Sequence, residues 1–465
     1  MNESMAHDLG NYIRAARWFG GKGRDFEIVD TRRLGLIGEY GATDLVELRF
    51  ADSEEPEFYQ LPLAFYPDRH GTLGHALIGT WEDPDFGPAF VYDATHDRVV
   101  MQAWLQRFAG NAAAVDPGGL DFRRLPGHKL DLEVHSTLFS GEQSNSSVAF
   151  GEDSLLKIFR KITPGINPDV EIHAELTRAG SDHVAALYGW LEYSTAAANA
   201  SDLLHLAMLQ QFLRTATDGW DLAQASVRNL FAAEDLTVEE SGGDFAGEAA
   251  RLGVALAETH QTLADHFPSA THDQDEMAAL AAMMNQRLDA AAQIAPALTP
   301  YSSALRTTYA AVERLSGVHV QRIHGDLHLG QTVRTVKGWK IVDFEGEPAA
   351  PLAQRRQPDS RWRDVAGMLR SFDYAPRAVE SSAADGDAEE SLARRARAAQ
   401  WVARNQEAFL LAYAGRELTE QEQALLAAYT ADKAVYETVY ETRNRPTWVP
   451  IPLEALERLA KIGAR

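Results

Sequence analysis

The chain has 465 residues, of which 45% are hydrophobic and 24% charged, and its formal net charge is −23. This composition is that of a globular protein, and the length predicts two or three domains. The negative charge argues against a nucleic-acid surface and against docking on anionic membranes. The chain has no cysteine, which excludes disulfides, Cys-zinc sites and thiol nucleophiles.

The first part of the chain is predicted to contain mixed helix and strand. Residues 7–17 have a helical pattern, and 44–50 and 57–65 have the pattern of strands. Apolar residues recur at helical spacing over 96–110, and the small residues, Pro and Gly of 111–120 indicate a linker. The N-terminus has no apolar run of signal-peptide length, and no stretch reaches the ~20 apolar residues of a membrane span. We therefore expect a cytoplasmic protein without a membrane partner.

Between residues 132 and 213 the pattern alternates between strand and helix. We expect a strand at 155–159, a helix at 167–180 and a buried strand at 205–213. After residue 218 the chain is mainly helical, except for a strand, loop and hairpin pattern at 318–348. The acidic stretch 380–390 is expected to be a surface loop. These changes of pattern predict three parts, 1–95, 96–213 and 214–465, and a sheet-containing first lobe followed by a helical second lobe.

The segment with the strand, loop and hairpin pattern at 318–348, called the island below, carries the residues suited to catalysis. His324-Gly325-Asp326 is followed by Gln331, five residues after the aspartate, and Asp343 follows on the next apolar strand. Phosphoryl transfer requires a group that orients the acceptor hydroxyl and takes its proton, and hard oxygen ligands for the metal that neutralises phosphate charge. His324 and Asp326 are therefore the candidate catalytic residues. A polar turn without chemistry is the alternative.

The spacing of this island matches a known catalytic loop. Protein kinases have His-x-Asp with an Asn five residues later, then Asp-Phe-Gly. Here Gln331 stands in place of the Asn, and Asp343-Phe344-Glu345 stands at the second site. The sequence HGDLHLGQ resembles the corresponding loop of the aminoglycoside-phosphotransferase superfamily of small-molecule kinases, whose usual form is HGDLHPGN.

Two segments of the first lobe fit a nucleotide site. The stretch 140–151, SGEQSNSSVAFG, lies where a phosphate-covering loop would lie, with small polar residues that present N–H groups and hydroxyls to phosphate. Lys157 on the following strand fits a contact with the α- and β-phosphates, with Glu171 as its expected ion-pair partner and Asp169 as the second choice. An ordinary hairpin and a surface lysine are the alternatives. The loop candidates are Gln143, Ser144, Asn145 and Ser146.

Two further expectations concern supporting segments. The strand that ends near Gln211 and Leu213 is expected to be the hinge that contacts adenine. Asp364, in the RDVAGMLRSFDY segment, is expected to begin a helix and to brace the catalytic loop from below, and Arg363 fits either a structural or a chemical role.

Several segments resemble one narrower family, the maltokinases. ARWFGGKGR (16–24), VYDATHD (91–97) and GEQSNSSV (141–148) match in the first half. DFEGEP (343–348), RDVAGMLRSFDY (363–374) and DKAVYETVYETRNRPTWVPIPL (432–453) match in the second half. The resemblance therefore covers nearly the whole chain.

The resemblance implies an α+β, bilobal, protein-kinase-like fold with an extra N-terminal cap subdomain on the first lobe and a mainly helical second lobe. It implies transfer of the ATP γ-phosphate to the anomeric hydroxyl of maltose for α-glucan synthesis. By family analogy Asp326 is the base, Gln331 and Asp343 bind Mg²⁺, and Glu345 assists. The family also associates or fuses with trehalose synthase, which implies such a partner.

The helix near the C-terminus has side chains suited to a sugar. Lys, Tyr and Glu residues fall at offsets 0, 3, 4, 7 and 8, which places them on one helical stripe. Such a stripe offers hydrogen-bond donors, acceptors and flat aromatic faces. A solvated charged face with core tyrosines is the alternative. The candidate acceptor residues are Lys433, Tyr436, Glu437, Tyr440, Glu441 and Arg443.

Other acceptors of the same fold remain open. Relatives with this catalytic loop and a similar ETRNRP segment resemble glucosamine kinases, which phosphorylate a 6-hydroxyl, and a carboxylate such as Glu437 or Glu441 would then face the ammonium. An aminoglycoside acceptor is a third candidate. A pseudokinase that only binds nucleotide is disfavoured because Lys157, Asp326 and Asp343 are all present.

Overall fold

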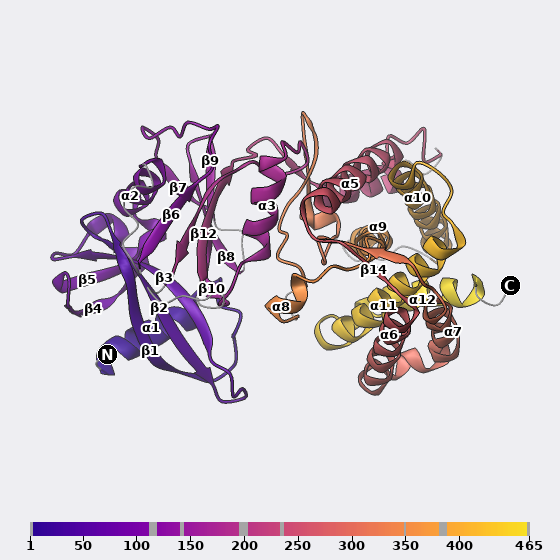
Figure 1. The fold of residues 1–465 in the computed structure, drawn as a ribbon, viewed down its shortest axis with the longest axis horizontal. Helices are drawn as coiled ribbons and strands as arrows, with labels where there is room; N and C mark the ends of the chain where they lie inside the picture. Colours follow the sequence, from indigo (N-terminus) through magenta and orange to yellow (C-terminus); the bar gives the residue numbers. More distant parts are fainter. Residues whose placement is uncertain are drawn as a thin grey trace. The chain divides into compact units, whose positions relative to one another are not determined.

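The computed structural model describes residues 3–110, 119–139, 144–194, 203–232, 237–347, 350–380 and 388–462. The chain forms two compact units (Figure 1). Unit 1 comprises Met1–Thr177 and Ala185–Arg214, and unit 2 comprises Arg178–Val184 and Thr215–Arg465. The architecture confirms the predicted α+β kinase-like fold, with a β-rich cap before the first lobe and a helical C-terminal part.

The cap of unit 1 is an antiparallel sheet with one helix packed on it. Its sheet has the order β1-β2-β3-β5-β4, and β10 pairs with β3. Hydrophobic side chains of α1, together with Trp18 and Phe19, pack on this sheet in a cluster of their own. The elements are α1 (Glu3–Ala15), β1 (Phe26–Ile37), β2 (Gly41–Phe50), β3 (Glu57–Tyr66), β4 (Leu77–Asp83), β5 (Gly87–Asp93), two short 3₁₀ turns (Gly71–Ala76, Ala94–His96) and α2 (Arg98–Ala109).

The remainder of unit 1 is a second six-stranded sheet, with the order β6-β11-β12-β9-β8-β7. The strands predicted at 155–159 and 205–213 are present as β9 and β12, and the helix predicted at 167–180 is α3. The elements are β6 (Leu120–Arg124), β7 (Ser136–Leu138), β8 (Asn145–Phe150), β9 (Ser154–Phe159), β10 (Lys161–Ile162), α3 (Pro168–Arg178), β11 (Leu187–Tyr193) and β12 (Leu204–Gln211). The linker predicted at 111–120 lies almost entirely outside the described residues.

The cap and the second sheet share one hydrophobic core. Trp104 and Phe108 of α2 are fully buried in a cluster that includes Tyr92 of the cap and Phe122 and Leu156 of the second sheet. The cap is therefore joined to the nucleotide-side sheet by continuous packing.

Unit 2 is mainly helical, with α9 in its middle and the other long helices around it (Figure 1). Its helices are α4 (Gly219–Ala232), α5 (Ala246–His266), α6 (Gln274–Ile294), α7 (Ser302–Glu313), α8 (Leu352–Arg355), α9 (Trp362–Glu380), α10 (Ala388–Ala414), α11 (Glu420–Asn444) and α12 (Pro450–Ile462). The acidic stretch predicted to be a loop falls partly outside the described residues, and its last residues begin α10.

Short strands and 3₁₀ turns connect these helices and carry the island at 318–348 as a strand, a loop and a hairpin. They are β13 (Thr217–Asp218), β14 (Ala270–His272), β15 (Val318–Val320), β16 (Thr332–Thr335), β17 (Gly338–Ile341) and the turns Pro296–Tyr301, Leu329–Gln331 and Pro446–Trp448. β14 pairs with β15, and β13, β16 and β17 form one sheet. None of the described helices combines the length and apolar character that crossing a membrane requires.

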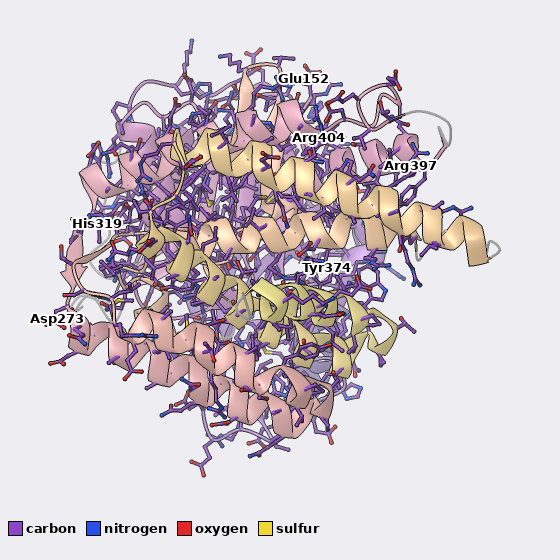
Figure 2. The ribbon with its side chains drawn as sticks, turned by 90° about the vertical axis from the view of Figure 1, so that its right-hand side faces the viewer. Glu152, Asp273, His319, Tyr374, Arg397 and Arg404 are labelled. Atoms are coloured by element: carbon purple, nitrogen blue, oxygen red, sulfur yellow. The ribbon has the colours of Figure 1, made fainter. Side chains whose placement is uncertain are left out.

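Two long helices of unit 2 begin at capping boxes that the sequence encodes locally. Asp273 accepts from the N–H of Glu276 at the start of α6, and the Glu276 side chain accepts from the Asp273 N–H (Figure 2). Thr419 and Glu422 form the same reciprocal pair at the start of α11. These caps satisfy N–H groups that a helix start leaves without partners, and so fix where both helices begin.

The shared core of unit 1 gives a stability prediction. We expect Trp104→Ala to destabilise the protein by about 3–5 kcal/mol, because it removes a fully buried indole. Val99→Ala on the same helix is the control, since Val99 is 57% exposed, and should change stability by no more than about 0.5 kcal/mol. Urea unfolding measures both, and equal effects would contradict the shared core.

Candidate active site

The loop that carries Asp326 follows β15 and turns sharply at Gly325. Gly325 has φ +87°, a conformation that side chains rarely adopt, and a Cβ there would lie 3.4 Å from the Gly346 Cα. The loop therefore requires glycine between His324 and Asp326.

His324 orients the loop through both ring nitrogens. Its Nε2 lies 3.0 Å from the carbonyl oxygen of Val342, and its Nδ1 accepts from the Asp326 N–H at 3.3 Å. Only Nε2 can then carry the proton, and both nitrogens are engaged with the backbone. The side chain is also buried. His324 therefore positions the Asp326 loop from behind, and its catalytic role stays a prediction.

Asp364, near the start of α9, holds the same loop from the other side. Its carboxylate accepts from the His324 N–H at 2.7 Å and from the Gly325 N–H at 2.8 Å, and lies 3.0 Å from Nε2 of His260. Burial raises the pKa of this carboxyl, but His260 and the backbone N–H groups outweigh burial and hold the pKa below its ordinary value. Asp364 therefore braces the loop, as its place in the sequence predicted.

Helix α9 approaches the loop closely over the next two turns. A Cβ on Gly367 would lie 2.4 Å from the carbonyl oxygen of Leu327, and the Ser371 hydroxyl accepts from the Leu329 N–H at 3.0 Å. Gly367, Ser371 and Asp364 lie on one face of α9, since they are separated by three, four and seven residues. The loop is thus supported along its length by one helix.

Gln331 and Asp343, the expected metal ligands, lie together at the base of the β16–β17 hairpin. Gln331 Nε2 donates to an Asp343 carboxylate oxygen at 3.1 Å, which leaves the amide oxygen of Gln331 for another ligand. Asp343 has φ 66°, the one non-glycine residue with positive φ among the residues described. Such strained residues cluster at functional sites. Carboxylate and carboxamide oxygens are ligands that suit Mg²⁺.

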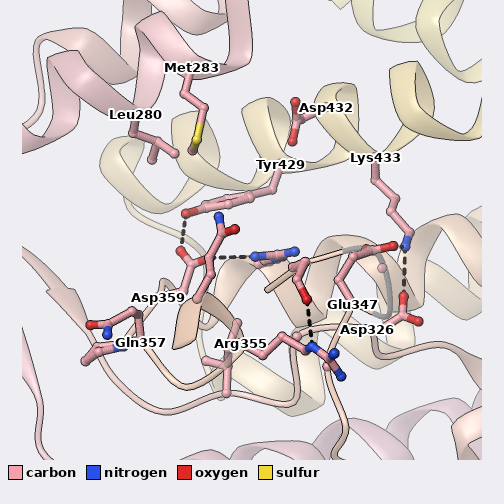
Figure 3. Close-up of a pocket in the computed structure, with 18 of the residues that line it drawn as sticks. Leu280, Met283, Asp326, Glu347, Arg355, Gln357, Asp359, Tyr429, Asp432 and Lys433 are labelled. Carbon is pink, nitrogen blue, oxygen red and sulfur yellow. Dashed lines mark hydrogen bonds and ion pairs between the residues drawn. The ribbon is translucent and has the colours of Figure 1, made fainter. Parts of the chain in front are cut away.

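A cavity of about 620 Å³ opens beside Asp326 within unit 2 (Figure 3). Its walls come from α6, α11, the loop after Gly346 and the start of α9. Five carboxylates and four basic side chains line it. The acids are Glu276, Asp326, Glu347, Asp359 and Asp432, and the bases are Arg287, Arg355, Arg363 and Lys433.

Most charges in this cavity are paired with each other. Arg363 lies 3.0 Å from Asp359, which also accepts from the Tyr429 hydroxyl at 2.7 Å (Figure 3). Arg287 and Asp432 lie 2.8 Å apart. Arg363, left open by the sequence, therefore shapes the cavity wall through its ion pair.

Lys433 of α11 reaches the proposed base directly. Its Nζ donates to Asp326 Oδ1 at 3.0 Å and lies 3.9 Å from Glu347 (Figure 3). Burial alone would lower the pKa of Lys433, but the carboxylates of Asp326 and Glu347 hold it above its ordinary value. Burial, with Glu347 next, raises the pKa of the Tyr436 hydroxyl to about 12. Lys433 and Tyr436 are the two predicted acceptor residues that line the cavity.

The other residues of the predicted stripe on α11 do not line this cavity, and their contact with an acceptor stays a prediction. Glu437 pairs at 2.7 Å with buried Arg370 of α9, and Glu441, 1% exposed, pairs with Arg445 at 2.7 Å and accepts from the Tyr374 hydroxyl. Both carboxylates are drawn toward α9. Tyr440 is 45% exposed beneath the guanidinium of Arg445, and Arg443 is exposed. None of these four is among the described residues that line the cavity.

In unit 1, Lys157 forms an ion pair with Asp169, the second of the two partners considered from the sequence. Nζ lies 2.9 Å from Asp169 Oδ2, and both side chains are buried. Asn167 accepts from the Asp169 N–H, which fixes the first turn of α3 so that Asp169 points at the strand. Burial raises the pKa of Asp169, but Lys157 and His173 outweigh it, so the pKa is lowered. Asp169 thus fills the role of the helix carboxylate that pairs with the strand lysine.

The predicted phosphate loop is only partly within the described residues. Gln143 lies outside them, Ser144 precedes β8, and Asn145 and Ser146 begin β8, opposite Phe159 and Ile158. The Ser146 hydroxyl accepts from Arg160 Nε at 2.8 Å and is buried. Ser146 is therefore held from within unit 1.

At the predicted hinge, the Gln211 N–H donates to Ala186 O at 2.8 Å and the neighbouring Phe212 N–H donates to Asp153 O. A contact from Gln211 to adenine would have to use its carbonyl or side chain. Leu213 is half-buried, and its contact with adenine stays a prediction.

Sequence reasoning missed most of the cavity wall. Glu347 lies within the quoted segment DFEGEP (343–348), four residues after Asp343, so proximity to the motif was an available signal. Leu280, Met283 and Arg287 come from α6, an Ala-rich helix without a motif, and the fold alone brings them to Asp326.

The chain is similar in sequence to known proteins, both in its cap and over two thirds of its length. The family model described as the maltokinase N-terminal cap domain matches residues 12–97. The glucosamine kinase of Streptacidiphilus jiangxiensis is 31% identical over 325 residues, which cover 67% of this chain and 70% of that protein. This chain belongs to the same family as that glucosamine kinase. It is an ATP-dependent sugar kinase of the aminoglycoside-phosphotransferase superfamily.

Two further members of the sugar kinase family extend the likeness. The glucosamine kinase of Mycolicibacterium smegmatis is 27% identical over 69% of this chain and 79% of its own length. A solved structure described as glucosamine kinase in complex with glucosamine, ADP and inorganic phosphate matches 99% of both chains, with a TM-score of 0.67 and 23% identity. At that identity the structure supports the fold.

The close approach of α9 gives a prediction for the catalytic loop. Gly367→Ala should cost about 1–3 kcal/mol of stability and lower kcat at least about tenfold, because the added methyl displaces the Leu327 backbone next to Asp326. Gly247→Ala on α5 is the control, since the nearest atom is an Arg251 guanidinium nitrogen at 3.7 Å. Thermal unfolding and initial rates measure both, and an unchanged kcat in Gly367→Ala would contradict the support role of α9.

Proposed function

We propose that this sugar kinase transfers the γ-phosphate of Mg·ATP to the 6-hydroxyl of glucosamine. The observation that carries the proposal is the cavity beside Asp326 with Glu347 in its wall, in a chain that is 31% identical to a glucosamine kinase over two thirds of both chains. This acceptor was the alternative to maltose in the sequence prediction, and the comparisons favour it.

Glu347 is the carboxylate we assign to the ammonium of an amino sugar. Asp359 and Asp432 are each within 3.0 Å of an arginine, and Asp326 is paired with Lys433. Glu347 lies 3.9 Å from Lys433, and its side chain is 18% exposed. A carboxylate in this position favours a cationic acceptor over a neutral sugar.

Asp326 would act as the base. As the acceptor oxygen attacks the γ-phosphorus and the bond to the ADP oxygen breaks, its proton passes to a carboxylate oxygen of Asp326. Lys433 holds Oδ1 at 3.0 Å, which leaves the second carboxylate oxygen for the acceptor. Gly325 and Asp364 fix the loop, so that the carboxylate is aimed before substrate arrives.

Mg²⁺ fits the paired side chains of Gln331 and Asp343, and Glu345 remains a candidate third ligand. Bound there, the metal would neutralise the charge of the phosphates. The amide oxygen of Gln331 and a carboxylate oxygen of Asp343 form a hard donor set, and the strained backbone of Asp343 supports a functional role. In unit 1, Lys157 would contact the α- and β-phosphates with Asp169 as its partner.

Maltose is the second candidate acceptor, and the match of residues 12–97 to the maltokinase cap supports it. The cavity of about 620 Å³ is within the usual range for small-molecule sites and is large enough for more than one sugar ring. This candidate would bring with it a role in α-glucan synthesis and a trehalose synthase partner.

The base assignment is tested with Asp326→Asn. We expect kcat with glucosamine to fall about 10²–10⁴-fold while ATP binding is retained, because the amide cannot take the proton. ADP release with glucosamine, maltose and glucose gives the rates, and calorimetry gives the affinity for ATP. An unchanged kcat would rule out Asp326 as the base, and a wild-type preference for maltose would favour the second candidate.

The ammonium assignment is tested with Glu347→Gln. The KM for glucosamine should rise about tenfold, which is about 1.4 kcal/mol, with little change in the KM for glucose. Glu437→Gln is the contrasting variant, since its carboxylate pairs with buried Arg370, and should lower the melting temperature without raising the KM for glucosamine. If Glu437→Gln and not Glu347→Gln raises that KM, the assignment is wrong.

A further inference from the structure

Arg160 lies at the point where the chain passes from the nucleotide-side sheet into the cap. It follows β9, the strand of Lys157, and precedes β10, which pairs with β3 of the cap sheet. Its carbonyl oxygen accepts from the Gln60 N–H at 2.7 Å, and its side chain is fully buried. Arg160 therefore lies at the junction of the two sheets.

The guanidinium of Arg160 joins the two sheets directly. Its Nε donates to the Ser146 hydroxyl at 2.8 Å, at the start of β8. Its Nη2 donates to the carboxylate of Asp93 at 3.0 Å and to the Thr95 hydroxyl at 3.3 Å, both in the cap. The Trp18 ring lies 4.9 Å from the guanidinium carbon. Residues from three of the segments quoted from the sequence, 16–24, 91–97 and 141–148, therefore all contact the Arg160 side chain.

The acceptor of this contact is itself fixed. The Asp93 carboxylate accepts from the Thr95 N–H at 3.0 Å, from the Thr95 hydroxyl at 2.7 Å and from the Tyr12 hydroxyl. Burial raises the pKa of Asp93, but Arg160 and these donors outweigh burial and lower it, so the pair is ionised at neutral pH. The fork of an arginine satisfies Asp93 and Ser146 at once, whereas the single ammonium of a lysine cannot reproduce that geometry.

This contact is better explained by positioning than by stability. A buried ion pair adds little net stability, and Arg160 Nη1 is buried without a hydrogen-bond partner among the residues that the structure describes. The Arg160 side chain instead fixes the start of strand β8 through Ser146. Ser146 lies opposite Ile158 and Ser147 lies opposite Lys157, so the held residue is next to the partner of the phosphate-binding lysine.

We propose that Arg160 is a positioning residue through which the cap holds the start of β8 and thereby sets the affinity for ATP. The inference rests on the nucleotide site of the proposed function, but it does not depend on which sugar is the acceptor. It gives the cap a role in nucleotide binding that its distance in sequence from the catalytic loop does not suggest.

The test compares Arg160→Lys and Asp93→Asn with the wild-type protein. We expect each to raise the Kd for Mg·ATP about tenfold, measured by calorimetry without sugar, while kcat and the KM for the acceptor stay within about twofold. Arg33→Lys is the matched control. Arg33 pairs with Asp44, Asp83 and Asp85 inside the cap, so its loss should lower the melting temperature without changing the Kd for ATP.

An unchanged Kd for ATP in Arg160→Lys and Asp93→Asn, with the same loss of melting temperature as in Arg33→Lys, would overturn the proposal. An equal loss of ATP affinity in Arg33→Lys would also overturn it, because the effect would then be general. If Arg160→Lys does not fold, the result with Asp93→Asn decides. A wild-type protein that binds ATP without phosphorylating glucosamine would contradict the proposed function and leave this inference intact.

Discussion

The carboxylate of Asp364 accepts hydrogen bonds from two consecutive backbone N–H groups, those of His324 and Gly325, and everything at the active site depends on this contact. It is buried, so water cannot replace those bonds, and it is kept ionised by His260 and by the N–H donors. Because Asp364 lies on α9, the loop is attached to the central helix of unit 2. Asp326 can then be exposed to a cavity without being free to move.

The cavity next to Asp326 shows how charge is arranged for an acceptor. Most acids and bases in its wall neutralise each other in pairs, such as Arg287 with Asp432 and Arg363 with Asp359. Pairing fixes the wall and lowers the cost of burying charge. Lys433 and Glu347 differ, because they lie close to the base itself. An acceptor that carries a positive charge would find its counter-ion there.

Local sequence patterns predicted much of the site, because the catalytic loop is a short continuous segment. The spacing of Asp326, Gln331 and Asp343 and the brace by Asp364 could be anticipated from the residues alone. The stripe on α11 could not be divided correctly, since helical spacing shows a face but not its partner. Arg370, which draws Glu437 away from the cavity, is 67 residues distant in sequence. The ion pair of Asp169 with Lys157 likewise depends on how Asn167 starts α3.

The match to the maltokinase cap domain covers residues 12–97, which belong to unit 1, whereas the cavity beside Asp326 is lined by residues of unit 2. Trp18, Asp93 and Ser146 all meet Arg160. The cap match therefore gives information about the architecture of unit 1. The identity of the acceptor depends on the residues of unit 2 that line the cavity.

The most direct test of the account is phosphorus NMR of the product formed when Mg·ATP is supplied with glucosamine and maltose together. The account predicts a phosphate ester on a primary carbon, seen as a proton-coupled triplet from the two hydrogens at C6 of glucosamine. A doublet from an anomeric phosphate on maltose would contradict the assignment of the cavity beside Asp326 to an amino sugar.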